Sequence, residues 1–233
     1  MTKTTGRTVA IGMTVAEALM IGVSGCSDSE GLPETSESGA RLAPSLSDYA
    51  GQLADKFAGS MDARQREAVE RVIETGEVSQ SDYEQALSDY RQCMIDRGYR
   101  EIIFLDMGGG IREEAAHQAG TDQQERRYAQ DSMACEDAYT TAIDELYRMQ
   151  VGNPGLLQDH NEAIADCLRR TGQVEPSYDG EQFRREYERY QNRTADSDEW
   201  PFSFPEDTPE SRVCRVSNGW ISMDQSDPTE QLW

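Results

Sequence analysis

The residues with the clearest capacity for chemistry are the cysteines, because a thiol can be oxidised to a disulfide or can bind a metal ion. The chain has five of them: Cys26, Cys93, Cys135, Cys167 and Cys214. Cys26 stands apart, since a short basic start and a mostly apolar segment precede it, followed by the small residues Ser24 and Gly25. This three-part layout is that of an export signal. The other four cysteines form an even set, which in an exported protein indicates two disulfides.

The residues Val23-Ser24-Gly25-Cys26 resemble the lipobox of bacterial lipoproteins, in which an aliphatic residue and two small residues precede a cysteine. The resemblance implies cleavage before Cys26 and a diacylglycerol thioether on its sulfur. Residues 1–25 would then be a signal peptide, and the lipid would hold the protein on the outer face of the cell membrane. The alternatives are a secretory signal without lipid and an uncleaved anchor. The apolar segment is shorter than the roughly 20 residues that a spanning helix needs, and Glu17 interrupts it.

The composition of the chain excludes one large class of partners. The formal net charge is −22, with 44 acidic residues against 22 basic ones. Such an excess of negative charge repels a phosphate backbone, so we expect no nucleic-acid partner. Residues 26–44 begin with the lipidated cysteine and are rich in Ser, Glu, Gly and Pro without periodicity, which predicts a disordered tether. A helical extracytoplasmic domain is expected over residues 45–220 and a flexible tail over residues 221–233.

A short motif occurs twice, as Cys93-Met94-Ile95-Asp96-Arg97-Gly98 and as Cys167-Leu168-Arg169-Arg170-Thr171-Gly172. In each copy the glycine is placed where a helix ends in the left-handed conformation, so the cysteine belongs to the last turns of that helix. We interpret the chain as two diverged helix-Cys-x4-Gly units. Each unit has a second cysteine further on, which pairs Cys93 with Cys135 and Cys167 with Cys214. A Cys93–Cys167 pair would contradict this interpretation, and a four-thiolate metal site lacks the close cysteine pairs that such sites use.

The elements that must position these cysteines are mainly α-helices, because apolar residues recur at helical spacing along most of the chain. Two short helices are expected first, and a third opens near Ser81 and ends at Gly98. Residues 99–105, Tyr-Arg-Glu-Ile-Ile-Phe-Leu, are β-branched and aromatic enough for a strand, and a turn is expected at 106–110. We therefore expect a small β-hairpin between the two units.

The second half of the chain is expected to be helical as well. A capping box of Thr121 and Gln124 opens one long helix that runs to Gly152. A further helix carries the second motif, and Asp179 caps the helix after it. A helical turn is expected at Thr208-Pro209-Glu210, ahead of the last cysteine. The fold class that follows is mainly α, a disulfide-stapled helical domain.

Three segments carry a wider family resemblance. They read xDYExALxxYxxCMxxxGY at residues 81–99, LYxxxxxNP at residues 146–154 and CLxxxG at residues 167–172. Together with the lipobox, they resemble a group of actinobacterial lipoproteins of unassigned function. The likeness covers most of the chain after the signal and implies a lipid-anchored extracytoplasmic protein. It implies no activity, and only a context beside exporters or cell-wall-binding proteins.

Candidate catalytic and metal-binding residues are few. The chain has two histidines, His117 and His160. Glu113 and His117 are four residues apart and could share a helix face, but no His-Glu-x-x-His motif or third ligand accompanies them. No Gly-x-Ser-x-Gly elbow marks a catalytic serine, and the glycines at 108–110 lack the lysine of a phosphate-binding loop. We therefore expect no metal, no cofactor and no enzymatic activity.

The tract Trp200-Pro201-Phe202-Ser203-Phe204 is the most unusual cluster of side chains. Aromatic residues between prolines in a loop either pack over the second disulfide or form an exposed recognition patch, since aromatics concentrate binding energy at interfaces. Trp200, Phe202 and Phe204 are therefore candidate recognition residues.

The function expected from these features is that of a non-enzymatic interaction or accessory module of a cell-envelope or transporter complex. Its partner would be an envelope protein, and its contact with the membrane would be the lipid on Cys26. One alternative is a solute-binding lipoprotein of a transporter, a class that usually needs two α/β lobes. A cell-wall hydrolase is the other.

Overall fold

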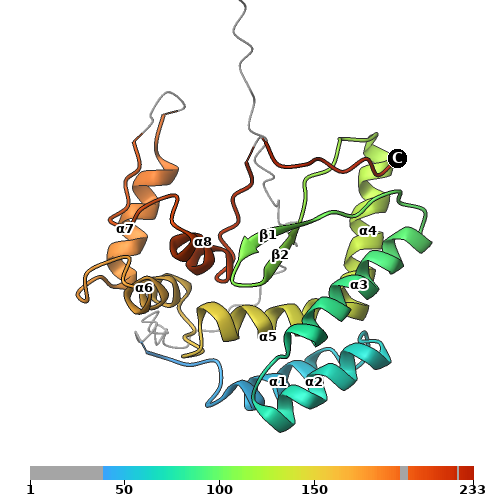
Figure 1. Cartoon of the computed structure of the whole chain (residues 1–233), viewed down its shortest axis with the longest axis horizontal. Helices are drawn as coiled ribbons and strands as arrows, with labels where there is room; N and C mark the ends of the chain where they lie inside the picture. The colour runs from blue at the N-terminus through green and yellow to red at the C-terminus, as the bar shows by residue number, and fades with distance from the viewer. Residues whose placement is uncertain (1–38, 195–198, 225) are drawn as a thin grey trace, which may run out of the picture. The chain divides into compact units, whose positions relative to one another are not determined.

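The computed structural model describes residues 39–194, 199–224 and 226–233, which form a mainly helical fold with one β-hairpin (Figure 1). The predicted signal peptide, Cys26 and the predicted tether as far as residue 38 lie outside the described residues. The expected mainly α fold class with a small hairpin is confirmed. No helix in the described ranges is long and apolar enough to cross a membrane. In chain order the elements are α1 Leu46–Lys56, α2 Ala63–Thr75, α3 Gln80–Asp96, β1 Phe104–Gly108, β2 Ile111–Glu114, α4 Asp122–Tyr139, α5 Thr141–Gly152, α6 His160–Arg170, α7 Gly180–Gln191 and α8 Pro209–Val216.

Helices α1 and α2 pack against each other, and both contact α5. Asp62 caps α2 through its side chain, and Gly76 ends that helix in the left-handed conformation with φ 75°. Helix α3 starts earlier than expected. Its N-cap is Ser79 rather than Ser81, and the Ser79 hydroxyl accepts the amide of Asp82 at 3.1 Å.

The prediction of a single long helix after the Thr121 capping box is wrong, although the capping box itself is present. The helix breaks at Thr140 into α4 and α5. Gln65 of α2 forms hydrogen bonds with backbone groups on both sides of this break. Its Nε2 donates to the carbonyl of Asp137 at 3.1 Å, and its Oε1 accepts the amide of Ala142 at 2.8 Å. A buried side chain from another helix thus replaces backbone hydrogen bonds that one continuous helix would make.

The β-hairpin begins later in the sequence than expected. Strand β1 starts at Phe104 and includes residues that were expected in the turn, and the chain reverses at Gly109 and Gly110. Both glycines have positive φ, 61° and 81°, as the two central residues of a type I′ turn require. Gly109 and Gly110 supply the left-handed conformations that the tight turn needs. The turn therefore forms at these two residues, and Gly108 pairs with Ile111.

Both copies of the Cys-x4-Gly motif end a helix in the Schellman motif, with the glycine in the left-handed conformation. Gly98 has φ 101° and Gly172 has φ 70°. In each copy the amide after the glycine donates to the carbonyl of the residue after the cysteine, at 3.2 Å for Met94 and 2.8 Å for Leu168. Both of these apolar side chains are fully buried. The motif is therefore a local device that ends a helix, and the common descent of the two units stays a prediction.

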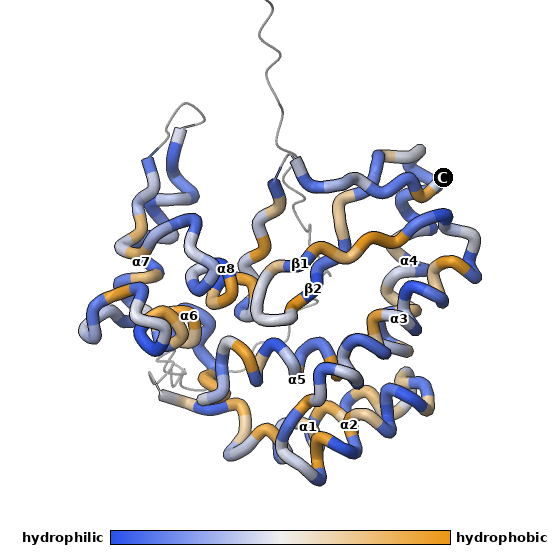
Figure 2. The backbone as a smooth tube through the Cα atoms, in the orientation of Figure 1, coloured by the Kyte–Doolittle hydropathy of each residue, from blue (hydrophilic) through white to orange (hydrophobic). Residues whose placement is uncertain are grey.

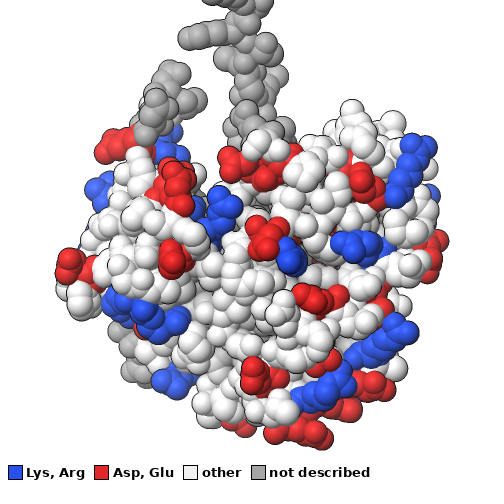
Figure 3. All heavy atoms as spheres, in the orientation of Figure 1, with Lys and Arg blue, Asp and Glu red and all other residues white. Residues whose placement is uncertain are grey.

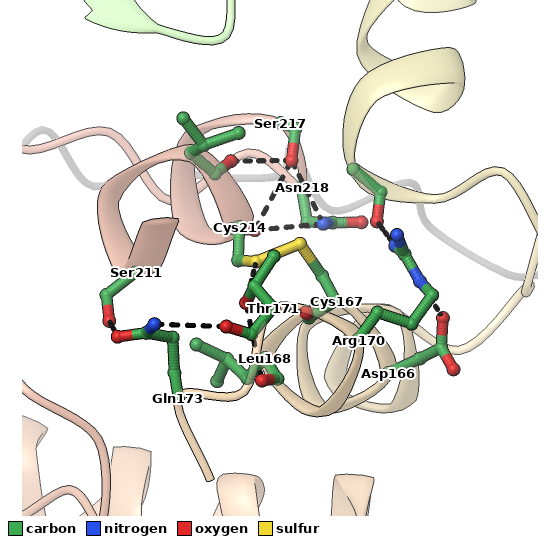
Figure 4. Close-up of a disulfide and its surroundings, with 12 residues drawn as sticks. Asp166, Cys167, Leu168, Arg170, Thr171, Gln173, Ser211, Cys214, Ser217 and Asn218 are labelled. Carbon is green, nitrogen blue, oxygen red and sulfur yellow. Dashed lines mark hydrogen bonds and ion pairs between the residues drawn. A yellow bond between two sulfur atoms is a disulfide. The ribbon is translucent and has the colours of Figure 1, made fainter. Parts of the chain in front are cut away.

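The two disulfides have the expected pairing. Cys93–Cys135 joins α3 to α4, and Cys167–Cys214 joins α6 to α8, with Cα–Cα distances of 5.9 and 5.5 Å. Figure 4 shows the second bridge between its two helices, where Thr171 and Asn218 flank the sulfurs. Because cytosolic thiols are kept reduced, two disulfides indicate an extracytoplasmic protein.

The buried apolar side chains form two main clusters. The first lies among α1, α2, α3, α5 and the hairpin and includes Val69, Ile111 and Leu146. The second surrounds the Cys167–Cys214 bridge among α6, α7 and α8. Figure 2 shows hydrophobic and hydrophilic positions alternating along these helices, as expected for elements with one buried face.

The packed part of the chain extends beyond the expected limits of 45–220. On the N-terminal side, Ala43 is buried and the amide of Leu42 donates to the carbonyl of Leu156 at 2.8 Å, so these residues do not belong to a disordered tether. On the C-terminal side, Leu232 is buried in the cluster around the first disulfide. The expected flexible tail is therefore wrong for its last residues, because an apolar side chain there completes this cluster.

Acidic and basic side chains are interspersed on the face shown in Figure 3. Several form ion pairs at the surface, such as Arg71 with Asp82 at 2.6 Å and Arg97 with Asp131 at 2.5 Å. On that face, the acidic excess does not gather into one patch.

Candidate functional site

The aromatic candidates Trp200, Phe202 and Phe204 differ in exposure. Phe202 and Phe204 are only 7% and 2% exposed and pack in the cluster that contains the Cys167–Cys214 bridge. Trp200 is half-buried, and its Nε1 donates to the carbonyl of Phe204 at 2.7 Å. The expectation of an exposed recognition patch is therefore wrong for the two phenylalanines, because their rings fill the interior beside the second disulfide.

Trp200, the third aromatic residue of this tract, also makes contacts within the fold. The guanidinium of Arg215 lies 5.5 Å from the ring of Trp200 and 5.2 Å from the ring of Trp220. Its Nη2 also donates to the carbonyl of Glu206 at 2.7 Å. A cation within reach of two indole rings is a stabilising arrangement, so this region is a packed aromatic cluster.

A buried carboxylate that the sequence analysis missed holds the aromatic loop. Glu186 of α7 is 2% exposed. It accepts the hydroxyl of Tyr178 at 2.6 Å, the side-chain amide of Gln182 at 3.2 Å, and both the backbone amide and the hydroxyl of Ser203, at 3.1 and 2.5 Å. These four donors satisfy the carboxylate, so its role is to fix the loop. One sequence signal could have identified it: Glu186 lies three residues after Phe183 and four before Tyr190, on the apolar face of α7.

Glu113 and His117 do not come together as a pair of metal ligands on one helix face, and each has another partner. Glu113 Oε1 lies 2.6 Å from Arg148 Nη1, whereas His117 Nε2 lies 3.0 Å from Glu125 Oε2. Glu113 belongs to a strand, so a spacing of four does not place it on one helix face with His117. Throughout the part of the chain that the structure describes, no group of three or more His, Cys, Asp or Glu could hold a metal ion.

A cleft of about 670 Å³ lies among α1, α3, the hairpin, α4, α5 and the start of α6. Its walls combine tyrosine, asparagine and charged side chains, and His160 lies at its α6 side. The volume falls within the range typical of ligand-binding pockets. Its charged residues are Arg112, Glu113, Glu114, Glu136, Asp144, Glu145 and Arg148.

Arg148 of α5 forms the ionic centre of the cleft. Its Nη1 lies 2.6 Å from Glu113 and its Nε 2.6 Å from Asp144, and it also donates to the carbonyl of Val216 at 3.0 Å. Burial alone would lower the pKa of Arg148, but Asp144 and Glu113 raise it above the ordinary value. Burial raises the pKa of Glu113 more than Arg148 lowers it. Arg148 thus joins the hairpin, α5 and the end of α8 through one partly buried cation.

Three further carboxylates line the cleft, Glu114, Glu136 and Glu145, and none has an ion-pair partner among the described residues. Each accepts hydrogen bonds from hydroxyl groups instead. Ser132 donates to Glu136 at 2.7 Å, and Tyr49 donates to Glu145 at 2.9 Å. A hydroxyl donor orients a carboxylate without neutralising it. The cleft therefore carries an excess of negative charge.

Two hydroxyl groups hold Glu114, since its oxygens accept hydrogen bonds from Tyr90 and Tyr128. Burial raises the pKa of Glu114, the two tyrosines offset this only in part, and Glu136 raises it further. Burial and the charge of Glu114 also raise the pKa of both tyrosines. A carboxylate with a perturbed pKa in a cleft marks a candidate functional group.

Most of the cleft was not foreseen from the sequence. Glu113 was considered only as a metal ligand together with His117, His160 was noted only as one of the two histidines, and the other lining residues come from distant parts of the chain. One available signal is the segment 146–154 of the family resemblance, because Asn153, a specified position of that motif, lines the cleft.

The chain matches no family model, no curated protein sequence and no solved structure in the comparisons made. The role of the cleft therefore has to be inferred from its own geometry and charge.

Proposed function

We propose that this protein is a lipid-anchored extracytoplasmic module of the cell envelope that binds a partner protein without catalysis. The two disulfides support a location outside the cytoplasm. The lipobox-like residues 23–26 support an anchor on Cys26. Two or more acyl chains on that cysteine would hold the protein stably at the membrane, where a single chain would be marginal.

The observation that carries the binding role is the unneutralised charge of the cleft. Glu136 and Glu145 line it with hydroxyl partners only, and Glu114 accepts two tyrosine hydroxyls without an ion-pair partner among the described residues. Opposite charge stabilises the ionised form of a carboxylate, so an arginine or lysine side chain of the partner is the group that fits this cleft best. Tyr49 and Tyr90 also line it, and the faces of aromatic rings attract cations.

Peptide titration of the full-length chain tests this charge recognition. The probes are a peptide with a central arginine and its citrulline analogue, which has nearly the same shape without the charge. We expect calorimetry to show binding of the arginine peptide that weakens with added salt. The double variant Glu136→Gln/Glu145→Gln should bind about tenfold more weakly, which corresponds to about 1.4 kcal/mol.

Glu188→Gln is the matched control, because Glu188 is an exposed residue of α7 outside the cleft. This control should bind as the parent does. Equal binding of the citrulline analogue, or unchanged binding by the double variant, would show that the carboxylates do not recognise a cation.

The volume of the cleft favours a second candidate function, a solute-binding lipoprotein. A cleft of about 670 Å³ can enclose much of a small molecule. Spermidine and free arginine are suitable probes, because each carries positive charge without a protein attached. Binding of a free cation at least as tight as that of the arginine peptide would favour this second function.

The lipid anchor has a separate test. The Cys26→Ser variant is expected to leave the membrane fraction, because a hydroxyl cannot form the thioether. Both disulfides should still form, since Cys26 takes no part in either. Retention of the variant in the membrane would contradict the anchor while leaving the role of the cleft open to its own test.

A further inference from the structure

The last residues of the chain, 230–233, form a C-terminal strap against the segment that follows β2. The amide of Glu230 donates to the carbonyl of Ala116 at 2.9 Å, and the amide of Gln118 donates to the carbonyl of Glu230 at 3.0 Å. The side chain of Leu232 is 1% exposed. The C-terminal strap is thus held by backbone pairing on one side and by apolar contact on the other.

The side chain of Glu230 is buried completely, at 0% exposed. Its Oε1 accepts the amide of Ile103 at 2.5 Å, and its Oε2 has no hydrogen-bond donor among the described residues. The carboxyl of Glu230 lies against that of Glu114. Both oxygens of Glu114 already accept tyrosine hydroxyls, so the two carboxyls meet without a donor between them.

The groups that face Glu230 add no compensating charge. Glu101 from the loop before β1 and Glu114 from β2 are both acidic, and Tyr128 from α4 is neutral. His117 lies beside the backbone of Glu230, but its Nε2 is engaged with Glu125 at 3.0 Å. Two ionised carboxylates in contact within a buried site repel each other strongly. A proton on one of them removes this repulsion and supplies the missing donor.

We propose that the C-terminal strap is a proton-dependent clasp, in which Glu230 docks as the neutral acid, donates its proton to Glu114, and leaves its site when that proton is lost to solvent. Ionisation places two negative charges side by side and leaves Glu230 Oε2 without a donor. Release of the C-terminal strap then uncovers the apolar cluster around the first disulfide, which contains Ile102 and Tyr99. This inference does not depend on what the cleft binds.

The pH range of the clasp follows from the groups around Glu230. Burial, with the charges of Glu114 and Glu101, raises the pKa of Glu230 to about 8 from its ordinary value of 4.5. The docked state therefore holds a proton that the released state loses. The stability that this proton gives to docking is full below the ordinary pKa of a glutamate and is lost as the pH rises to about 8.

Amide hydrogen exchange of the full-length chain measures this opening. The reporter is the amide of Gln118, which is bonded to the carbonyl of Glu230. After correction for the intrinsic exchange rate, its opening constant should rise about tenfold per pH unit between about pH 5 and pH 8 and then level off. The amide of Ala142, which is bonded to Gln65 far from the C-terminal strap in sequence, should show no such rise.

Glu230→Gln is the decisive variant, because its amide can accept from Ile103 and donate to Glu114 at every pH. Its Gln118 amide should be protected at pH 8 as well as at pH 5. Glu114→Gln provides a second test, since it removes the facing charge that raises the pKa of Glu230, and the rise should level off at a lower pH than in the parent. Glu181→Gln, at an exposed position of α7, should keep the slope of the parent.

A flat opening constant in the parent from pH 5 to pH 9 would overturn the proposal. So would a parent-like slope in Glu230→Gln. If Glu230→Gln fails to dock at any pH, Glu114→Gln decides the matter, and a rise that levels off at the same pH as in the parent overturns the clasp.

Discussion

Gln65 Oε1 accepts the backbone amide of Ala142 at 2.8 Å, across 77 residues of sequence. The same side chain donates to the carbonyl of Asp137 on the other side of the α4–α5 break. Gln65 is 2% exposed, so water does not readily replace these bonds. One glutamine of α2 therefore fixes where two other helices meet.

Replacement of Gln65 by methionine is expected to lower the free energy of unfolding by about 2 kcal/mol, because similar volume is kept while two buried backbone groups lose their partner. Urea denaturation measures the loss. Gln85→Met is the matched control, since Gln85 is an exposed residue of α3, and it should change stability little. Equal stability of the two variants would show that the bridge contributes nothing.

Removal of either disulfide is expected to cost about 4 kcal/mol in the chain-entropy model, because the closed loops have similar lengths. The sequence separations are 42 and 47 residues. The variants are Cys93→Ala/Cys135→Ala and Cys167→Ala/Cys214→Ala, compared by denaturation without reductant. A denaturation midpoint that stays at the parent value in either variant would contradict this account of that bridge.

Gly110→Ala is expected to destabilise the hairpin by about 2 kcal/mol or more, because a left-handed alanine alone costs roughly 1–2 kcal/mol. A Cβ at this position would also lie 2.3 Å from the hydroxyl of Tyr147, whose ring stacks on Tyr83 at 4.1 Å. Thermal unfolding measures the effect. Gly59→Ala serves as control, since a Cβ there would have no neighbour within 4 Å. The prediction is wrong if both variants unfold at the same temperature.

Glu186→Ala is expected to free the aromatic loop and to lower stability by about 3 kcal/mol, because hydrogen bonds to a charged group contribute about 1.5–3 kcal/mol each. Limited proteolysis should then cut near Ser203, whose amide and hydroxyl Glu186 accepts in the parent. Glu188→Ala, at an exposed neighbouring position of the same helix, should remain resistant. Resistance of both variants would mean that the aromatic rings alone secure the loop.

The elements that could be predicted are those with local signals. The Thr121 capping box, the Asp179 cap, and the glycines that end α3 and α6 each act through neighbours within a few residues, and all are found where expected. The disulfide pairing followed from the repeated motif and is confirmed. Local chemistry is sufficient in these cases, because the stabilising partner is close in the sequence.

The features that escaped prediction depend on partners far along the chain. The break at Thr140 requires Gln65, and the docked end of the chain requires Leu232 to find the cluster around the first disulfide. The cleft likewise combines carboxylates from β2, α4 and α5. Hydrophobic periodicity identifies a buried helix face but does not show which buried polar group that face will meet.

The two disulfides also determine how the protein would respond to mechanical tension between its ends. The two closed loops, which span 42 and 47 residues, follow one another along the chain without overlap. Neither loop can be extended by pulling while its sulfurs remain joined. At roughly 3.5 Å per extended residue, each bridge keeps about 150 Å of chain from lengthening. Pulling would therefore extend only the segment before Cys93, the segment between Cys135 and Cys167, and the segment beyond Cys214. Reduction of the bridges would release the two loops and lengthen the fully extended chain.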